Sequence, residues 1–149
     1  MKAQDTIGYQ VKSSWQSIVK MYNKLTADND FSQAEGYVLI SIKKDGIPVT
    51  KIAPSMGIEP TSLSRLLKTM EERGLIYRQK DLKDRRVVML FLTEKGLELK
   101  KMSRHMVLNY NKTVYDEIGH EEMDNFLKTM TKIRNITCKL TAQAEEQES

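Results

Sequence analysis

The chain has 149 residues, of which 40% are hydrophobic and 30% are charged, a composition typical of folded globular proteins. No apolar run approaches the roughly 20 residues that span a bilayer, and the N-terminal segment lacks the apolar centre of a secretory signal. The only cysteine, Cys138, excludes an intramolecular disulfide. We therefore expect a cytoplasmic protein without a membrane partner.

Positive charge is concentrated in the middle of the chain. The whole sequence has a net charge of +4, whereas the segment from Lys43 to Arg86 holds eleven Lys/Arg residues against six Asp/Glu, a net charge of +5. A central basic segment is typical of a unit that binds phosphate groups. A solvated basic surface without a ligand has the same composition, so charge alone leaves both interpretations open.

Two helices are predicted before residue 47. Apolar residues recur every three or four positions from Ile7 to Leu25, which predicts an amphipathic helix. The residues at 28–30 interrupt this pattern. Ser32 and Glu35 then form an S-x-x-E capping box, which begins a second helix. We expect that helix to end at residues 45–46, where a glycine favours a stop.

Two shorter helices with a tight turn between them are predicted next. Thr50 is expected to cap the first of them, Gly57 to end it, and Pro54 to remove one hydrogen bond in its first turn. Pro60 suits the first turn of the second helix, and Gly74 suits its end. The apolar residues of this second helix lie at helical spacing and predict a buried side made of Leu63, Leu66, Leu67 and Met70.

The period of the sequence changes after this helix. Residues 75–80 and 86–92 are rich in β-branched, aromatic and aliphatic side chains, and the charged residues 81–85 separate them, which predicts a β-hairpin. A long helix is expected from residue 93 to about residue 116, and a last helix from about residue 119. The last helix has a coiled-coil-like 4-3 spacing of Phe126, Met130, Ile133, Thr137 and Leu140.

The order helix, short helix, turn, helix and hairpin is typical of a winged helix-turn-helix, whose second helix enters the DNA major groove. Hydroxyl and cationic side chains lie opposite the buried side of residues 60–73. Arginine can bind guanine through two hydrogen bonds, and serine or threonine can bind bases or phosphates. A solvated face without a ligand is the alternative. We predict a DNA-contacting face made of Pro60, Thr61, Ser62, Ser64, Arg65 and Lys68.

The tip of the predicted hairpin is a second candidate for DNA binding. Lys83, Arg85 and Arg86 lie on a short ribbon that can reach phosphates or the minor groove. We expect Asp84 to hold an arginine by charge-assisted hydrogen bonds. Because charged residues also protect sheet edges against aggregation, the hairpin points to DNA only through its position after a helix-turn-helix.

Three segments together carry a resemblance to a known family. The run IEPTSLSRLLKTMEERGL at 58–75, the wing DLKDRR at 81–86 and LTEKG at 92–96 resemble the multiple antibiotic resistance regulator (MarR) family. The resemblance implies a bacterial or archaeal homodimer that binds pseudo-palindromic operators and usually represses. It also implies a ligand crevice between the dimerisation helices and the winged domain.

The resemblance assigns a role to each matching position. It implies major-groove contacts for Thr61, Ser62, Ser64 and Arg65, a phosphate contact for Lys68, and a wing arginine, Arg85 or Arg86, braced by Asp84. Two positions depart from the family pattern: Lys83 replaces a frequent arginine, and Pro54 is unusual in the short helix. Oxidant-sensing members carry a reactive cysteine near the N-terminus, whereas Cys138 lies in the last predicted helix.

The expected fold class is mainly α with a small β-hairpin wing. The expected parts are an N-terminal dimerisation helix at 1–30, a winged helix-turn-helix at 31–96 and C-terminal dimerisation helices at 97–149. The apolar stripes of the outer helices are expected to pair with a second copy; the alternative is that they fold back on their own subunit. For a small aromatic or amphipathic effector, we predict a pocket lined by Trp15, Tyr22, Tyr37, Met106 and Tyr110.

The expected function is sequence-specific transcriptional regulation, with repression released by a small-molecule effector. Two alternatives stay open: a dimeric DNA-binding protein without a ligand switch, and a redox switch through Cys138. An enzyme is disfavoured, because His105 and His120 lack metal-ligand spacing and no nucleophile elbow or phosphate-binding glycine loop is present. We therefore predict no catalytic residues, no cofactor and no metal.

Overall fold

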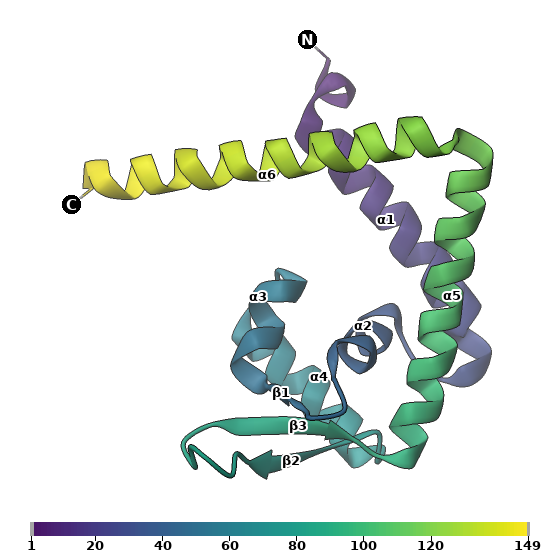
Figure 1. Ribbon diagram of the computed structural model, residues 1–149, viewed down its shortest axis with the longest axis vertical. Coiled ribbons are helices and arrows are strands. Elements are labelled where there is room, and N and C mark those ends of the chain that lie inside the picture. The colour runs from purple at the N-terminus through teal and green to yellow at the C-terminus, as the bar shows by residue number, and fades with distance from the viewer. Residues whose placement is uncertain (1, 149) are drawn as a thin grey trace. The chain divides into compact units, whose positions relative to one another are not determined.

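The structure is a computed structural model that describes residues 2–148. It is mainly helical, with one small antiparallel sheet (Figure 1). The chain divides into two compact units, one ending at Met106 and the other starting at Val107. The elements, in chain order, are α1 Ile7–Thr26, α2 Gln33–Ser41, β1 Ile47–Pro48, α3 Ile52–Met56, α4 Pro60–Glu72, β2 Ile76–Lys80, β3 Val88–Leu92, α5 Glu94–Ile118 and α6 His120–Glu148, with short 3-10 turns at Ala3–Asp5, Ala27–Asn29 and Val49–Lys51.

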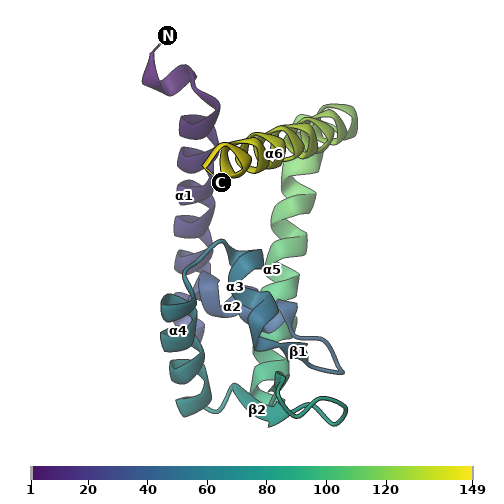
Figure 2. The same ribbon diagram turned by 90° about the vertical axis from the view of Figure 1, so that its left-hand side faces the viewer.

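The core of the first unit lies between α2, α3, α4 and the sheet. Figures 1 and 2 show these elements gathered together, with the loop between β2 and β3 projecting free of the helices. The expected buried side of α4 is confirmed: Leu63, Leu67 and Met70 are buried, and Leu66 packs against the core. The buried apolar residues that share this core are Val38, Leu39, Ile42, Ile52, Ala53, Leu63, Leu67, Met70, Leu75, Ile76 and Leu90.

The start of α2 is confirmed and its predicted end is wrong. The Ser32 hydroxyl accepts a hydrogen bond from the Glu35 N–H, and the Glu35 carboxylate accepts one from the Ser32 N–H, so the capping box is complete. The helix stops at Ser41, ahead of the predicted residues 45–46, because Ile42 is extended and buried in the core. The chain then turns at Gly46, whose φ is 77°.

The predicted cap of α3 is also wrong. Thr50 lies inside the 3-10 turn Val49–Lys51, which runs directly into α3, and Lys51 is the capping residue without a side-chain hydrogen bond. Because the residues before α3 are already helical, no hydroxyl is placed to accept from its first N–H groups. Pro54 lies in the first turn and Gly57, with φ of 63°, ends the helix, as predicted.

The predicted hairpin is part of a three-stranded sheet. β2 pairs antiparallel with β3, and the register places Ile76 opposite Leu92 and Lys80 opposite Val88. The second strand begins two residues later than predicted, because the Val87 N–H closes a turn on the Asp84 carbonyl. β1, which was not predicted from the sequence, covers the other edge of β3 through the pair Ile47 and Leu90.

The outer helices carry apolar side chains that this single chain leaves uncovered. On α1, Ile7 and Trp15 are 60% and 51% exposed, and on α6 Phe126 and Leu140 are 51% and 60% exposed. The stripes predicted from the sequence therefore exist on two long helices. Across residues 2–148, no helix has both the length and the apolarity that a bilayer crossing requires.

Candidate nucleic-acid interface

The α4 helix is built to turn a polar face outward. Pro60 occupies its first turn, where the missing N–H costs no hydrogen bond. Gly74, with φ of 68°, ends it by donating its N–H to the Glu71 carbonyl at 2.9 Å. With its apolar side in the core, the helix exposes all of the residues predicted to meet DNA, namely Pro60, Thr61, Ser62, Ser64, Arg65 and Lys68.

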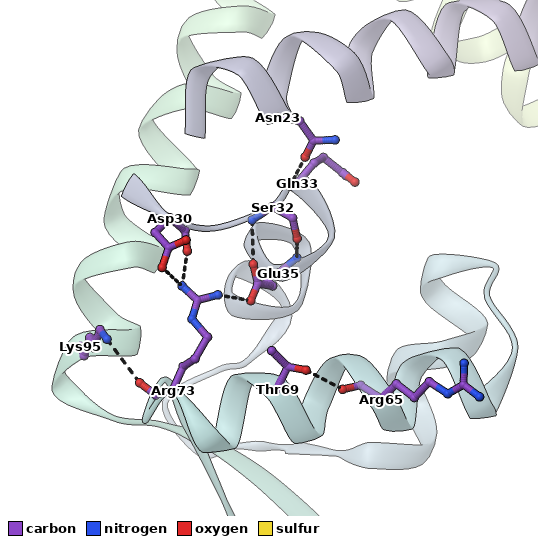
Figure 3. A network of polar contacts seen from close by, with 9 residues as sticks. All are labelled: Asn23, Asp30, Ser32, Gln33, Glu35, Arg65, Thr69, Arg73 and Lys95. Carbon is purple, nitrogen blue, oxygen red and sulfur yellow. Dashed lines mark hydrogen bonds and ion pairs between the residues drawn. The ribbon is translucent and has the colours of Figure 1, made fainter. Parts of the chain in front are cut away.

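Two cations on this face differ in their surroundings. Lys68 lies 3.9 Å from Glu72 in an ion pair whose side chains are 77% and 64% exposed, so the pair is weak. The Arg65 guanidinium makes no ion pair or hydrogen bond within residues 2–148, and Figure 3 shows it pointing away from the neighbouring polar network. Arg65 therefore offers its donors to an external acceptor.

The wing tip is ordered by its aspartates. One Asp81 carboxylate oxygen accepts the backbone N–H groups of Lys83 and Asp84, both at 2.8 Å. These hydrogen bonds favour the ionised carboxylate and lower the pKa of Asp81. The Asp84 carboxylate acts in the same way on the following residues, because it accepts the Arg86 backbone N–H at 3.1 Å.

The predicted brace of the wing is present on Arg86. The two oxygens of Asp84 accept from the Arg86 guanidinium at 3.0 and 3.1 Å, and this contact lowers the pKa of Asp84. Lys83 and Arg85 are exposed, and neither side chain makes an ion pair within the described part of the chain. The resemblance left Arg85 and Arg86 as alternatives; the geometry places the brace on Arg86 and leaves Arg85 open to solvent.

Two features of this region were not predicted from the sequence. Leu82 lies in the loop between β2 and β3, next to Lys83 in the sequence, and is 90% exposed. Arg73, at the end of α4, joins Glu35 and Asp30, which precede it by 38 and 43 residues. A charged residue directly before the glycine that ends α4 was the available signal for Arg73, but its partners could not be read from spacing.

The predicted effector pocket stays a prediction. Trp15, on α1, is 51% exposed, whereas Tyr22, Tyr37 and Met106 are half-buried. The Tyr37 hydroxyl donates to the Ser55 carbonyl at 2.9 Å, which holds that ring beside α3. Tyr110 is half-buried as well and belongs to the second unit.

Metal ligands do not gather in the structure. Among the residues that it describes, His, Cys, Asp and Glu nowhere form a group of three or more that could hold a metal ion. The ring of His120 contacts the ring of Tyr115, with 5.1 Å between centroids, and Cys138 is an exposed free thiol.

A helix-turn-helix pair, α3 and α4, followed by a braced hairpin defines a winged helix-turn-helix protein. Residues 31–88, from two residues before α2 to the first residue of β3, match the family model described as MarR family. The match makes this part of the chain similar to the MarR family, and the expected fold class is confirmed by the structure.

A curated protein is similar to this chain over a longer segment. The HTH-type transcriptional repressor MdtR of Bacillus subtilis (strain 168) is 31% identical over 101 residues, which are 64% of this chain and 65% of MdtR. This chain therefore spans slightly less than two thirds of that relative.

Two solved structures share the fold. A MepR–DNA complex of S. aureus has a TM-score of 0.77 at 22% identity and covers 87% of this chain and 96% of MepR. CouR from Rhodococcus jostii RHA1, bound to p-coumaroyl-CoA, has a TM-score of 0.78 at 23% identity and covers 89% of this chain and 94% of CouR. At such identities the likeness concerns the fold.

Proposed function

We propose that this chain is a cytoplasmic, sequence-specific transcriptional regulator without enzymatic activity, and that it represses by binding a pseudo-palindromic operator as a homodimer. The observation that carries the proposal is the exposed α4 face, on which the Arg65 guanidinium makes no ion pair or hydrogen bond within residues 2–148. The braced wing beside it supports the same function. MdtR is described as a repressor and MepR was solved with DNA, which agrees with the proposal.

In the proposed complex, α4 enters the major groove. Arg65 reads guanine through two hydrogen bonds, and the hydroxyls of Thr61, Ser62 and Ser64 meet bases or phosphates. The N–H groups at the Pro60 end of α4 favour phosphate, because a helix N-terminus is electropositive. Lys68 meets a phosphate. The wing then brings Lys83 and Arg85 to the neighbouring backbone or minor groove, with Asp84 holding Arg86.

A second copy completes the proposed unit. We assign residues 1–30 and 97–149 to dimerisation and residues 31–96 to DNA binding. The exposed apolar side chains of α1 and α6 are the proposed interface. A two-fold dimer presents two α4 helices to successive major grooves about 10 base pairs apart, which explains why the operator is expected to be pseudo-palindromic.

The effector is part of the same proposal. CouR was solved with p-coumaroyl-CoA, an aromatic acyl thioester. We propose that a small aromatic or amphipathic molecule binds the residues predicted above and favours a spacing of the two α4 helices that does not fit DNA. The proposed pocket consists of Trp15, Tyr22, Tyr37, Met106 and Tyr110.

Selection of DNA by the purified protein tests the proposal directly. Wild-type protein is expected to enrich a two-fold symmetric sequence from a pool of randomised duplexes at physiological salt. Arg65→Ala is expected to lose about 1–3 kcal/mol of binding free energy on that sequence and to tolerate changes at one base pair. If wild-type protein enriches no sequence, the proposed function is wrong.

A lysine on the same helix provides the contrasting variant. Lys68→Ala is expected to weaken binding to every duplex and to flatten the slope of log K against log salt by about one unit. Titrations at several salt concentrations, measured by fluorescence anisotropy, check this expectation. An unchanged slope would show that Lys68 does not contact phosphate. It would not bear on Arg65, which the Arg65→Ala variant tests.

A further inference from the structure

Arg73 is the last residue before the glycine that ends the recognition helix, and it makes contacts in three directions (Figure 3). Its guanidinium donates to the Glu35 carboxylate at 2.5 Å and to the Asp30 carbonyl. Its own carbonyl accepts from the Lys95 ammonium at 3.3 Å. Arg73 thereby joins the end of α4 to the start of α2, to the link after α1 and to the start of α5.

Glu35 serves two partners at once. One carboxylate oxygen caps α2 by accepting the Ser32 N–H at 2.7 Å, and the other accepts from Arg73. The Glu35 side chain is only 7% exposed, against 26% for Arg73, so water screens this ion pair weakly. The same carboxylate that starts α2 therefore fixes the end of α4.

The link between α1 and α2 also contacts Arg73. Asp30 has a left-handed backbone conformation, with φ of 53°, and its carbonyl accepts from the Arg73 guanidinium. The Asn23 side chain, near the end of α1, accepts the Gln33 N–H at 2.7 Å. Hydrogen bonds thus join α1 to the start of α2, and the start of α2 to the end of α4.

This network acts at the end of α4, between the core residues Met70 and Leu75. Arg65 lies eight residues from Arg73, which is about 12 Å along the helix axis, so a tilt of about 5° at Arg73 moves Arg65 by about 1 Å. A binding constellation has to be held within about 0.5 Å to keep its hydrogen-bond geometry. Leu67 and Met70 hold α4 against the core by apolar contacts, and the guanidinium of Arg73 adds directional hydrogen bonds at the end of the helix.

We propose that Arg73 is a positioning residue for DNA recognition: it touches no DNA, and through Glu35 and Asp30 it holds α4 at the angle at which Arg65 reads bases. The inference rests on the proposed function, because it presupposes that α4 reads DNA. It predicts that losing Arg73 impairs discrimination between sequences more than it impairs attraction to phosphate.

The test measures the affinity of wild-type protein and of one variant for two duplexes. Wild-type protein and Arg73→Gln are titrated against the duplex that wild-type protein enriches from a randomised pool, and against a shuffled duplex of equal length. We expect affinity for the enriched duplex to fall about tenfold and affinity for the shuffled duplex to change less than about twofold. The salt slope on the shuffled duplex should stay the same, since no phosphate contact is lost.

Matched variants separate positioning from general destabilisation. Glu71→Gln breaks the ion pair that joins α4 to Arg78 of β2, at 3.0 Å, and is expected to keep the wild-type ratio of the two affinities. Glu35→Gln should reproduce the effect of Arg73→Gln, and Arg73→Lys should fall between it and wild type, because lysine cannot donate to both acceptors in a fork. If Arg73→Gln does not fold, Glu35→Gln and Arg73→Lys test the positioning role in its place.

Each outcome bears on the inference. A salt slope that flattens by about one unit means that Arg73 binds phosphate itself and overturns the inference. An unchanged affinity ratio in Arg73→Gln and Glu35→Gln overturns it as well. Failure of wild-type protein to enrich any sequence is the separate result that ends the proposed function.

Discussion

At the wing tip, two carboxylates are held ionised by different donors. Backbone N–H groups of Asp84 and Lys83 lower the pKa of Asp81, whereas the Arg86 guanidinium and N–H lower that of Asp84. Because the folded tip favours the ionised forms, it is stabilised above the ordinary carboxyl pKa of 3.8. That stabilisation is lost as pH falls through the lowered values. We expect carboxyl carbon NMR titrations to place both midpoints below the ordinary value.

The donors of the two carboxylates predict different responses to one substitution. Arg86→Gln removes the guanidinium that lowers the pKa of Asp84, so the Asp84 midpoint should rise. The Asp81 midpoint should stay in place, because its donors are backbone groups. Equal shifts at both carboxyls, or midpoints at the ordinary value in wild-type protein, would contradict the described tip.

Gly96 is required where α5 passes the end of the recognition helix. A Cβ atom at this residue would lie 2.0 Å from the Leu75 carbonyl oxygen, a backbone atom that cannot move alone. Gly96→Ala is therefore expected to lower the free energy of unfolding by about 1–3 kcal/mol in urea titrations. Gly8→Ala is the matched control: no atom lies within 4 Å of its Cβ position, so the change should be neutral or stabilising. Equal effects would show that the close approach at Gly96 is absent.

At the scale of the elements, two helix caps were predicted from the sequence and one exists. Ser32 accepts the Glu35 N–H at 3.2 Å, so Ser32→Ala should cost about 1 kcal/mol of unfolding free energy. Thr50 lies in a 3-10 turn and caps nothing, so Thr50→Ala should change stability by less than about 0.5 kcal/mol. Chemical denaturation of both variants under the same conditions measures the difference. A larger loss in Thr50→Ala would restore the cap that the sequence suggested.

Local patterns predicted the elements, and contacts distant in sequence decided their ends. Helical spacing and Gly74 located α4, because both signals act within a few residues. α2 stops early since Ile42 is drawn into the core as extended chain, which no local signal encodes. The two residues of β1 were not predicted, because a strand this short has no pattern of its own and forms only by pairing with β3.

The candidate site shows the same division. The exposed face of α4 and the brace between Asp84 and Arg86 could be predicted, because their residues lie within one helix or two positions. Arg73 could not be assigned to the site, since Glu35 lies 38 residues away and is itself a capping residue. Residues that act through distant partners become visible only once the helices are placed together.

At the scale of the whole molecule, the exposed apolar stripes are the surface that we propose a second copy covers. Phe126 and Leu140 on α6 are 51% and 60% exposed, which is costly for long helices in water. If a second copy covers them, sedimentation should give twice the chain mass of 17.2 kDa. Replacing both residues by aspartate should produce monomers, because burying the new charges is unfavourable. Asn135→Asp, on the opposite side of α6, is the control and should stay dimeric.

The oligomeric state should also set the mode of DNA binding. A dimer gains from two half-sites at once, because the second recognition helix binds at a high effective concentration. The double aspartate variant should therefore bind a complete operator no more tightly than a single half-site, whereas wild-type protein and Asn135→Asp should prefer the complete operator by about 100-fold or more. Anisotropy titrations with full and half operators, run beside sedimentation of the same samples, measure both properties. A wild-type monomer that still prefers the complete operator would show that DNA, and not the apolar stripes, brings the copies together.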